Sequence, residues 1–143
     1  MTNERPTIYF DANVFIYGME KDDERGIVAR RWLKKVERSE IRAVTSELTI
    51  IEVLPHPLKT GNQKLANGYS RLLKHRPALQ VIAIDRPLLF HAADLRASLG
   101  MSTPDAIHVA TALATHCGGF LTEDDRLRPP SPLKKLVLAD LSQ

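Results

Sequence analysis

The stretch "STPDAIHVATALATHCGGFLTEDD" (residues 102–125) contains an expected helix followed directly by an expected strand. Ser102 or Thr103 can serve as the N-cap of the helix, and Pro104 suits its first helical position. We expect the pair Gly118–Gly119 to stop the helix in the left-handed conformation, with "GGFLTEDD" forming the strand. A helix that leads straight into a strand is typical of α/β proteins.

A carboxylate, Asp105, lies in the first turn of this helix. The helix dipole alone favours an acid there by roughly 0.3 to 1 kcal/mol. Taken by itself, Asp105 is therefore simply a good residue for starting a helix. Only partners elsewhere in the chain can give it another role.

Short apolar runs alternate with longer helical patterns over the rest of the chain, which predicts a parallel sheet flanked by helices. The expected strands are "TIYF" (7–10), "IRAVTS" (41–46), "LQVIAID" (79–85), "GGFLTEDD" (118–125) and "LKKLVLAD" (133–140). Helical patterns occupy 22–40; 47–57, halted at Pro55 and Pro57; 58–77, broken at Gly61 and Gly68; and 86–100, capped by Asp85 and stopped by Gly100. We expect residues 1–143 to form a single α/β domain.

Composition adds weaker constraints. The chain has 143 residues and a net charge of +3, and its pI is about 9.2, which mildly favours a polyanionic partner. Cys117 is the only cysteine, so we expect no intrachain disulfide, a reducing compartment and a small core residue at that position. No apolar run approaches a membrane span in length and no signal peptide is recognisable, so a soluble, cytoplasmic protein is expected.

Four acids are expected at the carboxyl edge of the sheet, where open parallel sheets bind their ligands. Asp11 directly follows the first strand, Asp124 follows the fourth, and Asp105 begins the helix before the fourth. Glu52 lies in an apolar helical segment, where a carboxylate is costly unless it is paired or bound to metal. Each acid alone has an ordinary explanation as a cap, a turn residue or an ion-pair partner. Together they indicate a site.

Clustered carboxylates repel one another, so they either take up protons or hold a cation. Oxygen ligands without a Cys or His cluster suit Mg²⁺ or Mn²⁺ better than zinc. His108, one turn after Asp105, either lines this site or is a satisfied, partly buried histidine. A basic helical segment is either a solvated helix face or a surface that contacts phosphates through Lys59, Lys64, Arg71, Lys74 and Arg76.

Four motifs, "IYFDANVFIY" (8–17), "TSELTIIEVL" (45–54), "TPDAIHVATA" (103–112) and "FLTEDD" (120–125), together resemble the PIN domain. The resemblance is strongest to the VapC-type toxins of bacterial toxin-antitoxin pairs. It implies a three-layer fold with a mostly parallel sheet of about five strands, and a metal-dependent endoribonuclease. The catalytic and metal-binding acids that it implies are Asp11, Glu52, Asp105 and Asp124, supported by Asn13 and Thr122, with Asp125 as an alternative to Asp124.

The same resemblance implies Mg²⁺, or Mn²⁺, as cofactor and RNA as substrate, with in-line attack of water on a phosphodiester. It also implies a homodimer and a cognate antitoxin, which would block the acidic pocket by inserting an Arg or Lys. The identity of the RNA and the number of metal ions stay open.

Three other functions are compatible with parts of the pattern. A catalytically idle RNA-binding or adaptor module would tolerate loss of some acids, yet all four positions are filled. A receiver-type signalling domain could use Asp85 as its phosphate acceptor, but Ala12 stands where it would need an acid beside Asp11. A phosphatase with Asp11 as nucleophile would need a second acid at position 13, where Asn13 stands.

Overall fold

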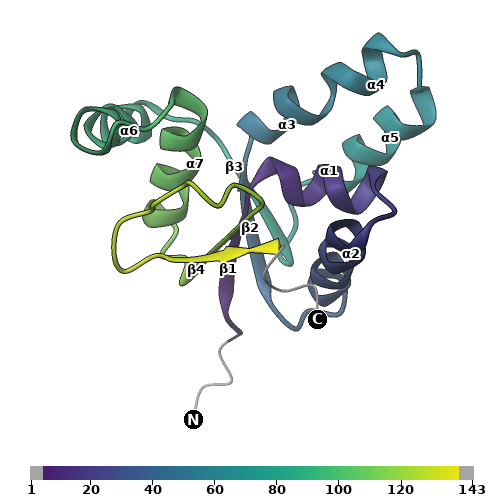
Figure 1. Ribbon diagram of the computed structural model, residues 1–143, viewed down its shortest axis with the longest axis horizontal. Helices are drawn as coiled ribbons and strands as arrows, with labels where there is room; N and C mark the ends of the chain where they lie inside the picture. The colour runs from purple at the N-terminus through teal and green to yellow at the C-terminus, as the bar shows by residue number, and fades with distance from the viewer. Residues whose placement is uncertain (1–4, 139–143) are drawn as a thin grey trace.

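The computed structural model describes residues 5–138, which form five strands and seven helices (Figure 1). The strands are β1 (Thr7–Phe10), β2 (Arg42–Ser46), β3 (Leu79–Ile82), β4 (Gly119–Thr122) and β5 (Lys134–Val137). The helices are α1 (Ala12–Glu20), α2 (Glu24–Glu37), α3 (Leu48–Val53), α4 (Pro55–Lys59), α5 (Gln63–Leu72), α6 (Arg86–Leu99) and α7 (Thr103–Ala114). All five expected strands are confirmed, although residues 139 and 140 of the last one lie outside the described residues.

The strands form one sheet in the order β3-β2-β1-β4-β5, and every neighbouring pair is parallel. From β1 the chain first builds outward through β2 and β3, and then returns to add β4 and β5 on the other side. The switch point between β1 and β4 is where open α/β sheets bind ligands. A receiver domain has the different order 2-1-3-4-5, so the strand order argues against that alternative.

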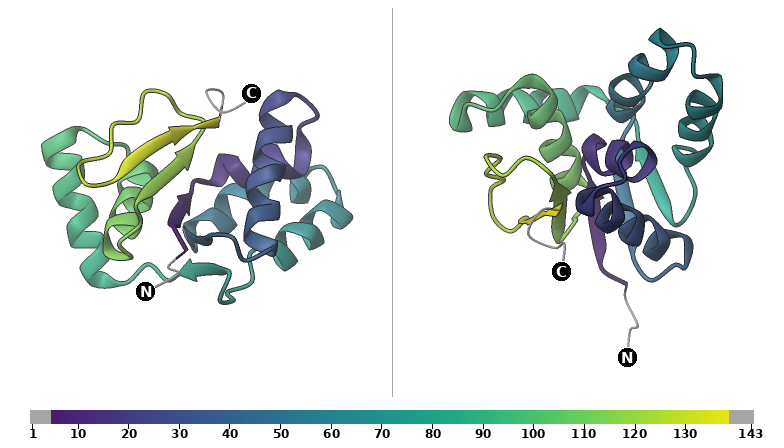
Figure 2. Two further views of the ribbon diagram at one scale, coloured as in Figure 1. Left: turned by 90° about the horizontal axis from the view of Figure 1, so that it is seen from below. Right: turned by 45° about the vertical axis from the view of Figure 1, so that its right-hand side comes forward.

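Helices cover both faces of the sheet and complete the expected three layers. Side chains of β1 alternate between the two faces: Ile8 and Phe10 pack with α1 and α2, whereas Tyr9 packs with α6 and α7. The two views of Figure 2 show these helix pairs on opposite sides of the strands. Cys117 is buried on the Tyr9 side, as expected for a small core residue. Within residues 5–138, no helix has both the length and the apolar character needed to cross a membrane.

The ends of α6 follow the sequence prediction, whereas the end of α7 does not. Asp85 caps α6, and Gly100 ends it with a left-handed φ of 67°. Ser102 is the N-cap of α7, and its side chain accepts the Asp105 N–H. The predicted stop at Gly118–Gly119 is wrong, because α7 ends at Ala114 and His116 takes the left-handed turn, with φ of 57°.

Of the other predicted helix breaks, those at Pro57 and Gly68 are wrong. Helix α3 ends at Val53, before Pro55, and α4 begins at Pro55 itself; Pro57 lies inside the first turn of α4, where the backbone N–H groups have no helical partner to lose. Gly61 does break the chain, with φ of 70°. Gly68, by contrast, lies inside α5, where a Cβ would come within 2.9 Å of the Met19 methyl group. This glycine therefore lies against the Met19 side chain of α1.

Gly26, near the start of α2, gives a direct test of local packing. Its N–H is capped by the Asp23 side chain, and a Cβ there would lie 2.0 Å from the Lys21 carbonyl oxygen. We expect Gly26→Ala to lower the free energy of unfolding by about 1–3 kcal/mol, as overpacking does. The matched control is Gly118→Ala, because a Cβ at Gly118 meets nothing within 4 Å. Urea unfolding of both variants measures the difference, and equal stabilities would contradict the packing.

Candidate functional site at the carboxyl edge of the sheet

Asp11 is the acid closest to the centre of the sheet. It follows β1, caps α1, and is only 9% exposed. Its Oδ1 accepts the backbone N–H of Asn13 at 3.1 Å, and its Oδ2 accepts the hydroxyl of Thr122 at 2.6 Å. These two hydrogen bonds compensate for the burial of a charge. Asn13 thus contacts Asp11 through its backbone, whereas Thr122 contacts it through its side chain.

Asp124 is joined to Asp11 through the same threonine. The Asp124 N–H donates to Thr122 Oγ1 at 3.0 Å, across the end of β4. The Asp124 Oδ1 accepts the backbone N–H of Arg126 at 2.9 Å, and the Arg126 Nε lies 3.7 Å away. The neighbouring Asp125 instead offers its backbone carbonyl to Lys135 at 2.7 Å. One threonine therefore sets the relative positions of two of the expected acids.

Asp105 lies in the first turn of α7, with its N–H on the Ser102 hydroxyl at 3.3 Å. Partial burial raises the pKa of the Asp105 carboxyl, and the negative charges of Asp11 and Asp124 raise it further. The hydrogen bond with Ser102 and the proximity of His108 act in the opposite direction without reversing the shift. The charges of Asp11 and Asp124 thus act on Asp105, although the three aspartates come from three separate segments.

Glu52, on α3, is held by a histidine. Its Oε1 lies 2.6 Å from His108 Nε2, and its side chain is 28% exposed. The His108 ring is 3% exposed, and its Nδ1 lies 2.5 Å from the Tyr9 hydroxyl. Of the two alternatives for His108, the satisfied buried histidine is the one observed. The sequence placed His108 near Asp105, but it gave no indication of the contacts with Glu52 and Tyr9.

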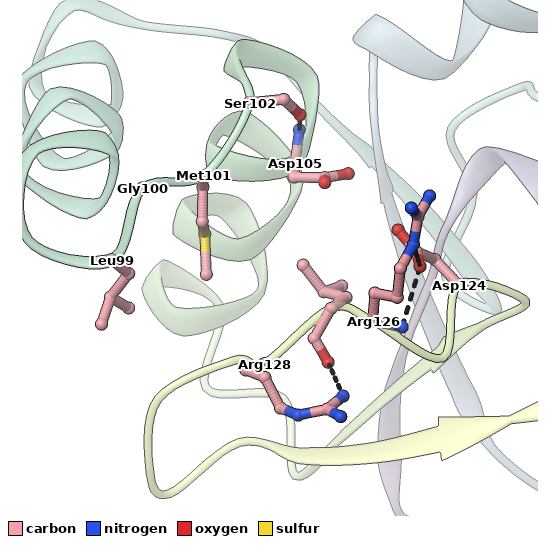
Figure 3. A pocket seen from close by; sticks show the side chains of 9 residues that line it. Leu99, Gly100, Met101, Ser102, Asp105, Asp124, Arg126 and Arg128 are labelled. Atoms are coloured by element: carbon pink, nitrogen blue, oxygen red, sulfur yellow. Dashed lines mark hydrogen bonds and ion pairs between the residues drawn. The ribbon is translucent and has the colours of Figure 1, made fainter.

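A pocket of about 410 Å³ opens between α7 and the loop that follows β4 (Figure 3). Asp105 and Asp124 line it together with Arg126 and Arg128, and the Asp105 carboxylate points towards the side where Asp124 and Arg126 lie. The Arg126 side chain is 92% exposed, whereas the Arg128 guanidinium donates to the backbone of its own loop. The pocket thus combines carboxylates with a solvated cation.

Arg25 and Glu123 form a contact at this edge that the sequence interpretation missed. Arg25 of α2 donates to Glu123 Oε1 at 3.2 Å, and both residues line a second pocket, of about 470 Å³, beside Asp124. Among the described residues, Glu123 Oε2 is the one buried side-chain oxygen or nitrogen without a hydrogen-bond partner. The only sequence signal was an acid next to Thr122. This ion pair ties α2 to the loop after β4.

The basic helical segment lies apart from the Asp105 pocket. Lys64 and Arg71 line a different pocket on α5, together with Met19 of α1. Arg76 is paired with Glu37 at 2.8 Å. The cations that line the pockets at the acidic edge are instead Arg126 and Arg128, in the loop after β4, and Arg25 of α2.

The donor chemistry at this edge fits a hard divalent cation, although the carboxylates do not form a tight cluster. Within residues 5–138, no three Asp, Glu, His or Cys side chains come together as a group able to hold a metal ion. The acids that share one electrostatic environment, Asp11, Asp105 and Asp124, offer only oxygen, the ligand atom that Mg²⁺ and Mn²⁺ prefer. Glu52 approaches this environment through its contact with His108.

A family model and a set of solved structures both indicate the same fold. A family model described as the PIN domain matches residues 8–129. Solved structures with this fold include a toxin-antitoxin complex from Klebsiella pneumoniae, which is 20% identical with a TM-score of 0.68 over 92% of this chain and 97% of that chain. VapBC2 from Rickettsia felis, bound to a promoter DNA fragment, is 14% identical with a TM-score of 0.72 over 92% and 98% of the two chains.

Mycobacterium tuberculosis VapC20, described as a sarcin-ricin loop cleaving toxin, is 15% identical, with a TM-score of 0.64 over 79% of this chain and 86% of that chain. At these identities the similarity concerns the fold. No curated protein matches the chain significantly.

The raised pKa of Asp105 predicts that its charge costs stability. In the unfolded chain this carboxyl ionises near 3.8, and in the folded protein it ionises at higher pH. The folded state is therefore disfavoured as the pH rises through the folded pKa. We expect Asp105→Asn to raise the Tm by a few degrees at pH 7 in EDTA, and this gain to shrink as the pH falls towards 3.8.

Thermal unfolding across this pH range is the measurement. Asp94→Asn, the same change at an exposed position of α6, is the control and should leave the Tm nearly unchanged. A lower Tm for Asp105→Asn at pH 7 would mean that the helix-starting role of Asp105 outweighs the repulsion.

Proposed function

Because the chain belongs to the PIN domain family, we propose that it is a metal-dependent endoribonuclease and the toxin of a toxin-antitoxin pair. The observation that carries this proposal is the convergence of Asp11, Asp105 and Asp124 at the switch point of the sheet. The geometry concentrates negative charge where a parallel sheet binds ligands, and a divalent cation would neutralise it.

The residues that would hold Mg²⁺, or Mn²⁺, are Asp11, Asp105 and Asp124, with Glu52 beside them. When bound there, such a cation supplies Lewis acidity, which lowers the pKa of water and offsets charge on a phosphodiester. Thr122 holds the Asp11 carboxylate through its hydroxyl and accepts the backbone N–H of Asp124, so it links the two acids. The N-terminus of α7 favours an approaching phosphate, and Arg126 adds an exposed positive charge to the lining of the pocket.

The phosphatase alternative has less support. Both Asp11 oxygens accept hydrogen bonds and the side chain is nearly buried, which is a poor arrangement for a phosphatase nucleophile. Asp125, the alternative to Asp124, lines only the second pocket, whereas Asp124 lines both. A catalytically idle binding module differs from the nuclease in having no activity, so an activity measurement separates the two.

Cleavage of labelled, structured RNA tests the enzymatic proposal. We expect cleavage with Mg²⁺ or Mn²⁺, none with EDTA, and a loss of more than about 100-fold in Asp11→Asn and in Asp105→Asn, larger than the effect typical of residues that only support a metal ligand. Single-stranded loops are the expected targets, because their bases are accessible. VapC20, described as cleaving the sarcin-ricin loop, makes such a loop a sensible first substrate.

Asp94→Asn is the matched control and should retain full activity. Cleavage that persists in EDTA, or in both folded variants, would contradict the carboxylate site. Failure of every RNA to be cut, with no rise in Tm on adding metal, would favour the idle binding module.

We propose in addition that a cognate antitoxin binds over the acidic pocket. Two of the similar structures are described as a toxin-antitoxin complex and as VapBC2, which supports such a partner. A partner's Arg or Lys placed between Asp105 and Asp124 would pair with carboxylates that repel each other. A homodimer and a cytoplasmic location stay predictions.

Growth on induction tests this role. Expression of the wild-type chain should arrest growth, Asp105→Asn should relieve the arrest, and co-expression of the product of a neighbouring gene should rescue growth and yield a stable complex. Lack of toxicity in the presence of RNA cleavage in vitro would point instead to a housekeeping nuclease.

A further inference from the structure

A chain of two short hydrogen bonds links Tyr9 of β1, His108 of α7 and Glu52 of α3. The Tyr9 hydroxyl lies 2.5 Å from His108 Nδ1, and His108 Nε2 lies 2.6 Å from Glu52 Oε1. Tyr9 is fully buried and stacks on Phe120 of β4, with ring centroids 5.0 Å apart and an interplanar angle of 15°. The inner end of the chain is therefore held rigidly within the core.

We propose that His108 is a positioning residue that, braced by Tyr9, fixes the Glu52 carboxylate at the carboxyl edge of the sheet for metal binding. This inference rests on the proposed function, since it assigns a role within the same site.

The hydrogen-bond directions follow from the groups themselves. A carboxylate oxygen accepts, so His108 Nε2 is the donor to Glu52 Oε1, and a ring with its proton on Nε2 alone presents Nδ1 as an acceptor to the Tyr9 hydroxyl. Glu52 is thereby the acceptor at the end of a directed chain.

Only one oxygen of Glu52 is used in this way. In the described part of the chain, Oε1 takes the His108 contact, and no hydrogen bond engages Oε2. One oxygen is anchored, and the other remains available to a ligand. A glutamate on the six-residue helix α3 without this anchor would lose more side-chain entropy on binding a ligand.

Metal-ligating carboxylates are themselves commonly hydrogen-bonded by neighbouring residues, and loss of such a neighbour typically costs about 10–100-fold in metal affinity. His108 also lies close enough to Asp105 to affect its carboxyl electrostatically. The same buried ring therefore adjoins two of the expected ligands, from helices that are otherwise separate in sequence.

Mn²⁺ titration of the intact protein tests the inference. We expect His108→Ala to weaken Mn²⁺ binding by about 10–100-fold, Tyr9→Phe to weaken it less, and His108→Gln, whose amide can donate, to restore part of the affinity. Thr111→Val is the matched control, because Thr111 is fully buried one turn further along α7 and its hydroxyl bonds only within the helix. It should leave Mn²⁺ affinity within about twofold, whatever its effect on Tm.

A folded His108→Ala protein that binds Mn²⁺ as the wild type does would overturn the inference and leave the proposed function intact. Should His108→Ala not fold, Tyr9→Phe and His108→Gln decide by the same titration. Should wild type neither bind Mn²⁺ nor cleave RNA, the proposed function fails, and metal-free crystal structures decide the positioning role. Displacement of the Glu52 carboxylate in the His108 variants supports it, and an unchanged carboxylate overturns it.

Discussion

The hydrogen bond from the Thr122 hydroxyl to the Asp11 carboxylate connects the ends of β1 and β4, and the acidic edge depends on it. A carboxylate that is 9% exposed is tolerated only when its charge is compensated, and Thr122 and the Asn13 N–H provide that compensation. The Thr122 oxygen in turn accepts the Asp124 N–H. A single hydroxyl therefore compensates one acid and places the next, at the gap that the reversal of strand order creates.

The position of Asp105 reflects two opposing electrostatic effects. The N-terminus of α7 favours a carboxylate there, whereas burial and the charges of Asp11 and Asp124 disfavour it. The raised pKa means that the unfavourable effects dominate in the protein alone. Such local destabilisation is typical of residues kept for binding or catalysis rather than for stability. A cation at this edge would reverse the balance, because it would turn repulsion among the carboxylates into shared attraction.

Local patterns in the sequence predicted most of the fold, because strands, caps and apolar periodicity depend on neighbouring residues. Asp85 and Gly100 bound α6 as expected, and each expected strand is present. Errors arose where packing between distant elements decides the outcome. Gly68 stays helical because α5 lies against Met19, and His116 adopts the left-handed turn before the chain enters β4.

The candidate site likewise has residues that the sequence predicts and contacts that it does not. Asp11, Asp105 and Asp124 could be placed at one edge because each follows a strand or starts a helix, and in a parallel sheet those positions coincide. The partner of Glu52 could not be predicted, since His108 is 56 positions away and Tyr9 is 99 positions from His108. No local spacing encodes that contact. It depends on the strand order and on the face of β1 to which Tyr9 belongs.

The two sets of hydrogen bonds that hold acids at this edge both begin at β1 or directly after it. Alternation along this four-residue strand directs Phe10 to the α1 and α2 layer and Tyr9 to the α6 and α7 layer, and the next residue is Asp11. Tyr9 braces His108 and through it Glu52, while Asp11 meets Thr122 and through it Asp124. Because β1 is the central strand and is almost fully buried, it is a well-packed support for these acids. Precise placement of mutually repelling carboxylates requires such a support, since any freedom would let them separate.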